Sequence, residues 1–343
     1  MNQSRQAHDP TVAKTSNPSR PGKPGQARGN SPIVLIGSFA PGEERAWLDA
    51  LRRAMPQERV LPIEEIGEPA EVDVAIVANP DPAVVRRFPS LSWVQSLWAG
   101  VEKLVAEPAF ASIPVVRMVD PQLARTMAEA VLAWTLYLHR DMPAYLAQQR
   151  SRLWRQLPYV APADRCVGIL GLGALGTAAA RTLRQAGFAV QGWSRTPKRV
   201  DDLGGVATWS GQSGLHEMAS HTDILVCLLP LTRQTRHLVD AALLQRLPAQ
   251  ACLINFGRGP LVRTPDLLAA LDAGHLKHAV LDVFDEEPLP IRSPLWQHPG
   301  VTVLPHISAD TDPATASLIV ARNVAEWRSK GQIPAAVDRQ LGY

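Results

Sequence analysis

The sequence contains little cysteine and lacks any apolar run long enough to cross a membrane. Only three cysteines occur in 343 residues, Cys166, Cys227 and Cys252, each inside an apolar, strand-like segment. Because no Cys-x-x-Cys or His-x-x-x-His pattern is present, we expect reduced, buried thiols and no metal site. A membrane span needs about 20 consecutive apolar residues. No segment approaches that length, so we expect a soluble, cytoplasmic protein.

The net positive charge is small and mostly scattered. It amounts to +3, and the basic residues that do gather lie near the N-terminus among Pro, Gly and Ser rather than among aromatic side chains that could stack on bases. We therefore expect no nucleic-acid partner. Residues 1–30 lack the apolar core of a secretion signal, so we interpret them as a disordered extension outside the fold.

From residue 32 onward, short apolar segments alternate with helical ones. The chain is long for one hydrophobic core, which predicts two domains, and the alternation predicts parallel α/β sheets. A long helix expected over 125–149 leads from the first domain to the second, and a helix over 312–330 returns to the first. The expected strands are 32–37, 72–77, 91–97 and 115–119, then 167–170, 188–193, 222–230, 251–256, 278–284 and 301–306.

The chain is organised around residues 167–176, where a buried strand runs into a Gly-x-Gly-x-x-Gly turn and an Ala-rich helix. Gly171 permits the tight turn, Gly173 lets the backbone approach a diphosphate, and Gly176 lets the helix pack closely on the sheet. The N-terminus of that helix offers free N–H groups and a positive dipole end to phosphates. The pattern predicts a dinucleotide site that includes Gly171, Gly173, Ala174, Leu175 and Gly176.

The strand after this turn ends without the acidic residue that would accept hydrogen bonds from an adenosine ribose. Ser194-Arg195-Thr196-Pro197-Lys198-Arg199 stands there instead. Cations and hydroxyls suit a ribose 2′-phosphate, which a carboxylate would repel. We therefore predict NADPH in preference to NADH, with a solvated basic turn as the alternative. The residues expected to bind this end of the cofactor are Trp193, Ser194, Arg195, Thr196 and Lys198.

Two further segments have features of a substrate site or an interface. Trp98-Ala99-Gly100-Val101 follows a predicted strand end, where Gly100 permits close backbone approach and free N–H groups could hold a carboxylate. An ordinary strand-to-helix turn explains this segment equally well. Trp154 lies in a polar loop, and an exposed tryptophan suggests an interface.

Three polar residues of complementary chemistry follow strand ends in the second domain: Arg258, Glu287 and His306. Parallel strands present their carboxyl ends at one edge of a sheet, so we expect these residues to meet at the nicotinamide side. Reduction of a 2-keto acid requires an anion clamp and an acid that protonates the developing alkoxide. Arg258 suits the first role and His306 the second, while Glu287 would orient the imidazole and favour its protonation. Singly, each residue also has a purely structural explanation.

Four segments, in order along the chain, resemble the successive signatures of the D-isomer-specific 2-hydroxyacid dehydrogenases. They are Gly171–Gly176, Asn255–Gly259, Leu281–Leu289 and Pro305–Ala309. The stretches 193–196, 293–299 and 337–343 resemble the glyoxylate and hydroxypyruvate reductase branch. The resemblance covers residue 32 to the C-terminus. Gly257 departs from it, because the family often has a small residue with a side chain there.

The resemblance implies further roles. Arg258, Glu287 and His306 would be the catalytic set, and Asp282 would orient the nicotinamide amide. A homodimer joined through the cofactor domains is implied too, in which Trp154 reaches the substrate pocket of the partner. The residues expected to border the cofactor are Leu229, Pro230, Leu231, Phe256 and Gly257.

These observations predict an α/β protein with two doubly wound parallel-sheet domains and a cleft between them. A flavodoxin-like substrate domain would comprise 31–124 and 307–343, and a Rossmann-like cofactor domain 125–306. The predicted reaction is NADPH-dependent reduction of glyoxylate to glycolate and of hydroxypyruvate to D-glycerate. The alternatives are a dehydrogenase for bulkier 2-keto acids and a non-catalytic, nucleotide-sensing interaction protein.

Overall fold

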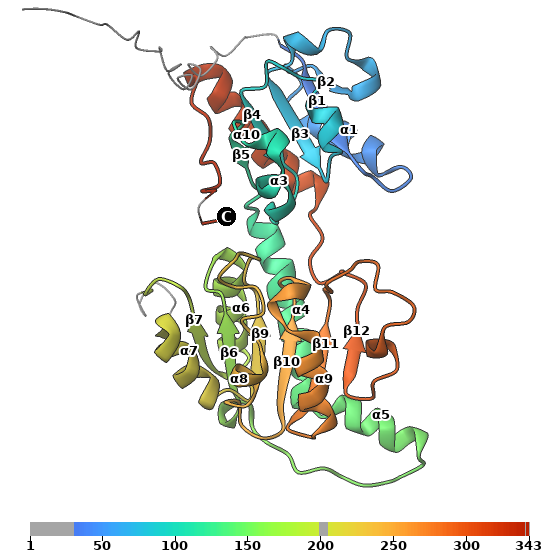
Figure 1. Ribbon diagram of the computed structural model, residues 1–343, viewed down its shortest axis with the longest axis vertical. Coiled ribbons are helices and arrows are strands. Elements are labelled where there is room, and N and C mark those ends of the chain that lie inside the picture. Colours follow the sequence, from blue (N-terminus) through green and yellow to red (C-terminus); the bar gives the residue numbers. More distant parts are fainter. Residues whose placement is uncertain (1–30, 199–204, 340, 343) are drawn as a thin grey trace, which may run out of the picture.

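The computed structural model describes residues 31–198, 205–339 and 341–342. The extension expected at 1–30 and the predicted basic residue Arg199 lie outside the described residues. Two sheets form two lobes, which lie one above the other in Figure 1. Every pair of neighbouring strands is parallel, which confirms the predicted fold class. The domain boundaries proposed from the sequence stay predictions.

The smaller lobe is built on a five-stranded sheet with the order β2-β1-β3-β4-β5, the flavodoxin-like arrangement. Its strands are β1 (Ile33–Gly37), β2 (Val60–Pro62), β3 (Val74–Ala78), β4 (Trp93–Ser96) and β5 (Val115–Val116). Its helices are α1 (Glu43–Ala54), α2 (Pro82–Val85), α3 (Glu102–Ala106) and α10 (Pro313–Lys330). Strand β2 was not predicted, because it has only three residues, of which Val60 alone is buried, and so gives no clear apolar run.

Helix α10 belongs to the smaller lobe although it comes from the far end of the chain. It packs beside α1 over one face of the five-stranded sheet, where Trp47 and Trp327 are both fully buried. Arg328 binds the carboxylates of Glu58 and Asp73, and its own side chain is only 9% exposed. A buried guanidinium and two buried carboxylates satisfy one another there, so the helix is held by charge as well as by apolar contact.

The larger lobe contains a seven-stranded sheet with the order β12-β11-β10-β9-β6-β7-β8. Counted from β6, this is the Rossmann-like order, and the direction of winding reverses between β6 and β9, where ligands bind beyond the carboxyl ends of the strands. The strands are β6 (Cys166–Leu170), β7 (Ala189–Trp193), β8 (Ala207–Trp209), β9 (Ile224–Cys227), β10 (Ala251–Asn255), β11 (Leu276–Leu281) and β12 (Val301–Val303). The covering helices include α6 (Ala174–Gln185), α7 (Gly211–Ser220), α8 (Ala241–Leu244) and α9 (Thr264–Asp272).

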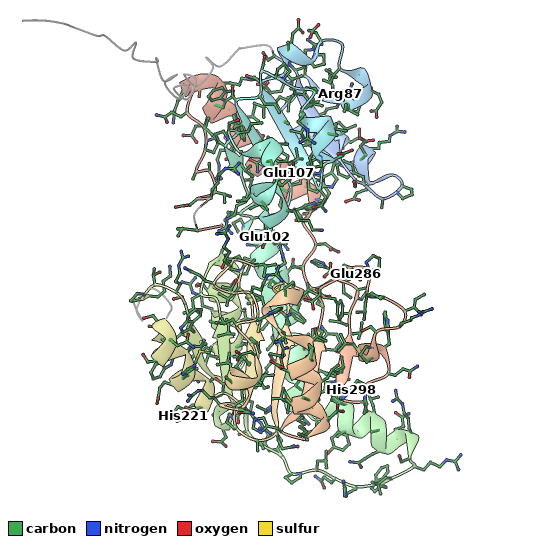
Figure 2. The ribbon with its side chains drawn as sticks, viewed as in Figure 1. Arg87, Glu102, Glu107, His221, Glu286 and His298 are labelled. Carbon is green, nitrogen blue, oxygen red and sulfur yellow. The ribbon has the colours of Figure 1, made fainter. Side chains whose placement is uncertain are left out.

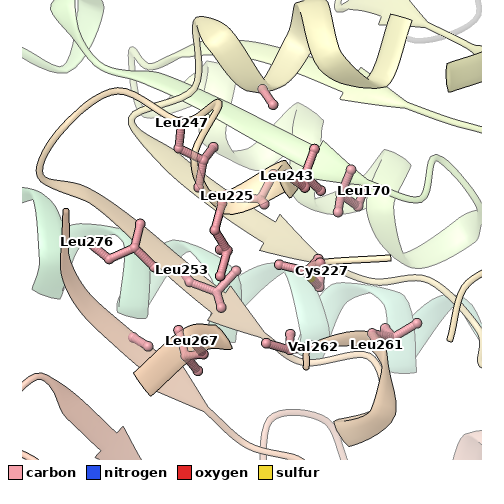
Figure 3. Close-up of a cluster of buried hydrophobic side chains, with 14 of the residues drawn as sticks. Leu170, Leu225, Cys227, Leu243, Leu247, Leu253, Leu261, Val262, Leu267 and Leu276 are labelled. Carbon is pink, nitrogen blue, oxygen red and sulfur yellow. The ribbon is translucent and has the colours of Figure 1, made fainter. Parts of the chain in front are cut away.

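Both faces of the seven-stranded sheet are buried. Figure 3 shows one core, to which β6, β9 and β10 contribute Leu170, Leu225 and Leu253. The adjacent residues of the same strands face the other core: Ile169, Val226 and Ile254. Because successive side chains point to opposite faces of a strand, burial of both faces produces the continuous apolar runs seen in the sequence.

The three cysteines are free, and all three lie in strands of this sheet. Burial raises the pKa of Cys227 to about 12 and that of Cys252 to about 11. The pKa of Cys166 also rises to about 11, chiefly through burial. All three therefore remain protonated thiols near neutral pH and are poor nucleophiles.

The single helix predicted over 125–149 is wrong. The chain forms two helices, α4 (Pro121–His139) and α5 (Met142–Arg150). Asp141 between them has a φ of 55°, in the left-handed region, and its carboxylate binds Lys277. Pro143, in the first turn of α5, has no N–H with which to continue the preceding helix. The chain after α5 carries exposed apolar side chains, and Trp154 is fully exposed.

Within residues 31–198, 205–339 and 341–342, no helix combines the length and the apolar character that a membrane crossing would require.

Candidate active site

The glycine turn joins β6 to α6 at the point where the larger sheet reverses its winding. Gly171 has a φ of 107°, and a Cβ at Gly176 would overlap the carbonyl oxygen of Gly171, so both positions require glycine. A Cβ at Gly173 would meet no protein atom within 4 Å. Packing does not require glycine there, whereas close approach of a diphosphate to the backbone would. Gly173 also caps α6 without a side-chain hydrogen bond, which leaves N–H groups for phosphate. The residues present therefore fit a dinucleotide.

The turn after β7 is stabilised by the side-chain hydroxyl of Ser194. Ser194 donates a hydrogen bond to the carbonyl oxygen of Thr196 at 2.7 Å, and Thr208 donates to that of Lys198 at 3.0 Å. Thr196 and Lys198 are exposed, and Arg195 is partly exposed. The indole of Trp193 instead lies in the core and donates to the carbonyl oxygen of Gly211. Its side chain therefore supports this turn from the core side of the sheet.

The loop after β10 is braced by Asn255, a residue that the sequence analysis did not single out. Its side-chain oxygen accepts from the N–H of Gly257 at 3.2 Å, and its side-chain amide donates to the carbonyl oxygen of Arg258 at 3.0 Å. A Cβ at Gly257 would lie 2.8 Å from the Leu261 side chain and 2.9 Å from the carbonyl oxygen of Leu229. Close packing against the neighbouring strand end therefore accounts for glycine at this position.

The guanidinium of Arg258 lies against the smaller lobe. A Cβ at Gly100 would overlap its Nη2 atom, so the predicted substrate loop meets the predicted carboxylate clamp at this glycine. Trp98 packs on Trp47, with ring centroids 5.9 Å apart, and Val101 is buried. These two side chains therefore anchor the loop in the smaller lobe, and Gly100 is the member that touches Arg258.

His306 and Glu287 form the predicted pair. The Nδ1 atom of His306 lies 2.8 Å from Oε2 of Glu287, and Oε1 of Glu287 accepts from the N–H of Phe284 at 2.9 Å. The hydrogen bond with Glu287 raises the pKa of His306 above its ordinary value, although burial opposes it. For Glu287 burial favours a higher pKa, but the bonds from His306 and Phe284 lower it overall. Both shifts favour the imidazolium form of His306 and the carboxylate form of Glu287.

Asp282 holds the turn that presents His306. Its two carboxylate oxygens accept from the N–H groups of Ile307 and Ser308 at 2.8 Å and 2.9 Å. His306 itself has a φ of 57°, a left-handed conformation that a non-glycine residue adopts at an energetic cost. The charge of Asp282 also raises the pKa of His306. Asp282 therefore positions the imidazole through the backbone.

The three predicted catalytic groups lie within electrostatic reach of one another. The charge of Arg258 lowers the pKa of both His306 and Glu287. Trp154 does not join them within one chain, because the segment after α5 lies at the end of the larger lobe remote from the smaller one (Figure 1). Leu229 and Phe256, which were predicted to border the cofactor, have buried side chains. They can therefore offer the cofactor backbone atoms rather than side-chain atoms.

We expect Glu287→Gln to shift the pH profile of reduction. In its predicted role as the acid, His306 must be protonated, so we expect the rate of reduction to fall as pH rises through the raised pKa of that residue. Without the carboxylate charge that pKa drops, and the fall moves to lower pH, with a loss of about 10-fold or more near neutral pH. The measurement is kcat/KM against pH, and the matched control is Glu286→Gln, on the exposed neighbouring carboxylate. An unmoved alkaline limb in Glu287→Gln would contradict this role.

A glycine turn at the switch point of a doubly wound sheet, with an arginine and a Glu–His pair after strands of the same sheet, is the arrangement of an NAD(P)-dependent oxidoreductase. The chain belongs to the D-isomer specific 2-hydroxyacid dehydrogenase family, because residues 132–308 match the family model described as "D-isomer specific 2-hydroxyacid dehydrogenase, NAD binding domain". The resemblance found in the sequence is thereby confirmed.

Solved structures of family members are similar over nearly the whole chain. A D-isomer specific 2-hydroxyacid dehydrogenase from Xanthobacter autotrophicus Py2, in complex with NADPH and MES, is 38% identical with a TM-score of 0.86, over 92% of this chain and 100% of that one. An NADPH-dependent glyoxylate/hydroxypyruvate reductase of Sinorhizobium meliloti, with NADP and sulfate, is 35% identical with a TM-score of 0.84 at the same coverage. A probable 2-hydroxyacid dehydrogenase from Rhizobium etli CFN 42, with NADP, HEPES and L(+)-tartaric acid, is 32% identical with a TM-score of 0.82.

Proposed function

We propose that this protein reduces small 2-keto acids with NADPH, converting glyoxylate to glycolate and hydroxypyruvate to D-glycerate. The observation that carries the proposal is the 2.8 Å pair of His306 and Glu287, which lies close enough to Arg258 for its charge to act on both groups. The described activity of the similar Sinorhizobium meliloti reductase supports it.

The proposed roles follow from the chemistry of each side chain. The nicotinamide cofactor, when bound, supplies the hydride that reduces the carbonyl carbon. Arg258 pairs with the substrate carboxylate and carbonyl oxygen, which fixes the carbonyl carbon in place. Imidazolium His306 gives its proton to the developing alkoxide oxygen, and Glu287 stabilises the charged ring before that transfer. Asp282 is proposed to orient the nicotinamide amide as well as the His306 turn.

The test is an initial-rate assay of NADPH and NADH with glyoxylate, hydroxypyruvate, pyruvate, phenylpyruvate and 2-ketoisocaproate. Faster turnover of glyoxylate and hydroxypyruvate supports the proposal. Much faster turnover of phenylpyruvate or 2-ketoisocaproate would favour the enzyme for bulkier acids. Tight NADPH binding without oxidation by any keto acid would favour the nucleotide-sensing protein.

We propose NADPH rather than NADH because the turn after β7 offers Arg195, Thr196 and Lys198. Replacing Arg195 with aspartate should raise the KM for NADPH about 10- to 100-fold, since a charge-assisted hydrogen bond is lost and a repulsive carboxylate is added. The KM for NADH should change far less. Arg246→Asp, at an exposed residue in the turn after α8, is the control for an equal change of net charge. An unchanged KM for NADPH would remove this assignment.

We also propose a homodimer joined through the cofactor lobes. Leu153, Trp154 and Tyr159 leave an exposed apolar surface after α5, and such surfaces mark interfaces. Light scattering should give twice the mass of the 37.3 kDa chain. A mass equal to one chain would contradict the dimer and the contribution of Trp154 to the partner's pocket.

A further inference from the structure

Glu102 connects the two lobes at the site itself. It is the first residue of α3, directly after the substrate loop, and Figure 2 shows it where the lobes meet. Its Oε1 atom lies 3.3 Å from Nε of Arg258 and accepts from the N–H of Leu231, also at 3.3 Å. Its Oε2 atom accepts from Nη2 of Arg258 at 3.4 Å. One carboxylate of the smaller lobe thus binds two groups of the larger lobe.

This contact leaves a defined part of the guanidinium for a ligand. Nε and Nη2 face Glu102, and Nη1 donates to the carbonyl oxygen of Gly257 at 2.7 Å. Arginine has five N–H groups, so one on each terminal nitrogen is left. The side chains of Glu102 and Arg258 are only 19% and 32% exposed, which makes the pair resistant to screening by salt.

The backbone of the same loop restricts the guanidinium further. Because Gly100 has no side chain, Nη2 fits against the loop backbone. The loop therefore limits the position of that nitrogen on one side, and Glu102, the residue after the loop, binds it on another. In this structure the smaller lobe therefore contributes both the space and the carboxylate that fix the position of Nη2. The orientation of the clamp thus depends on how the two lobes lie against each other.

We propose that Glu102 is the positioning residue for Arg258. It takes the Nε and Nη2 edge of the guanidinium and turns the remaining N–H groups toward the keto acid when the lobes close. The inference rests on the proposed function for the identity of the ligand. A contrary model is that Glu102 occupies the place of the substrate carboxylate and must leave before the acid binds. The two models predict opposite changes in affinity.

Glu102→Ala and Glu102→Gln test the proposal in the full-length protein. The exposed Glu71→Gln, in the same lobe, is the control. The first readout is the dissociation constant of oxamate, measured by calorimetry with NADP(H) present. Oxamate carries a carboxylate beside a carbonyl and is not reduced, so this readout does not depend on turnover. The second readout is KM for glyoxylate against KM for NADPH.

The expected result for Glu102→Ala is oxamate binding weaker by about 10- to 100-fold. The KM for glyoxylate should rise in parallel, with the KM for NADPH nearly unchanged. Glu102→Gln retains one acceptor oxygen and should recover part of the loss. In the Arg258→Ala background, Glu102→Ala should add almost nothing, because its effect passes through the arginine.

Tighter oxamate binding by Glu102→Ala would overturn the proposal in favour of the competing carboxylate. Unchanged oxamate binding by Glu102→Ala would overturn it as well. So would an undiminished effect of Glu102→Ala when Arg258 is already alanine. Failure of the wild-type protein to bind oxamate would also overturn it. If the wild type binds oxamate but reduces no keto acid, the proposed function fails, and the oxamate data still decide the role of Glu102.

Discussion

His306→Gln is expected to lower kcat for keto-acid reduction by about 10²- to 10⁴-fold. Glutamine can still form a hydrogen bond with Glu287, but it cannot supply the proton that the alkoxide needs. The dissociation constant of NADPH should stay nearly the same, because the imidazole is held by its hydrogen bond with Glu287, and the glycine turn has its own place after β6. Stopped-flow single turnovers and fluorescence titration of NADPH measure the two quantities separately.

The control is His216→Gln, on a histidine that lies on α7 and hydrogen-bonds only to the exposed Gln212 among the partners found in the described part of the chain. It should keep the wild-type rate. Near-normal turnover by His306→Gln would show that the proton comes from another group, and the assignment of the acid would then be wrong.

Arg258→Ala is expected to lower kcat/KM for glyoxylate by about 10²- to 10³-fold or more. The substrate loses its carboxylate partner, and Glu102 is left partly buried without the cation that now compensates it. Arg258→Lys keeps the charge but not the planar fork, so it should recover only a small part of the loss. Steady-state kinetics with glyoxylate and titration with NADPH check both variants.

NADPH binding should change little in these arginine variants. A KM for glyoxylate that stays at the wild-type value in Arg258→Ala would mean that the carboxylate binds elsewhere in the cleft. A large loss of NADPH affinity would instead indicate that Arg258 holds the cofactor. Thermal unfolding of each variant separates either outcome from a loss of folded protein.

The sheets were predictable because their strands are buried on both faces. Leu253 and Ile254 point into different cores, so the periodic signal of a half-exposed strand is absent and a continuous apolar run takes its place. Strands β2 and β8 escaped prediction because each has three residues and partial burial. The break before α5 depends on Asp141 and its long-range partner Lys277, a contact that local periodicity does not contain.

Part of the geometry of the candidate site could also be predicted, whereas the roles of its residues stay predictions. Arg258, Glu287 and His306 each follow a strand end, and parallel topology brings strand ends together. Glu102 could not be recognised in this way. It is separated from Arg258 by 156 positions and belongs to the other lobe, so only the three-dimensional arrangement of the two lobes reveals the contact. Asn255 was equally hidden, since an asparagine at a strand end is common and its two hydrogen bonds are local.

The placement of α10 determines the order in which the lobes can be completed during synthesis. The strands of the seven-stranded sheet are contiguous along the chain and can pair as soon as β12 has left the ribosome. The five-stranded sheet is synthesised first but is completed last. The apolar surface around Trp47 is covered only after Val320, Val324 and Trp327 of α10 have been synthesised. A nascent chain therefore carries an uncovered apolar surface until its last long helix emerges, and this is the stage at which a chaperone would be needed most.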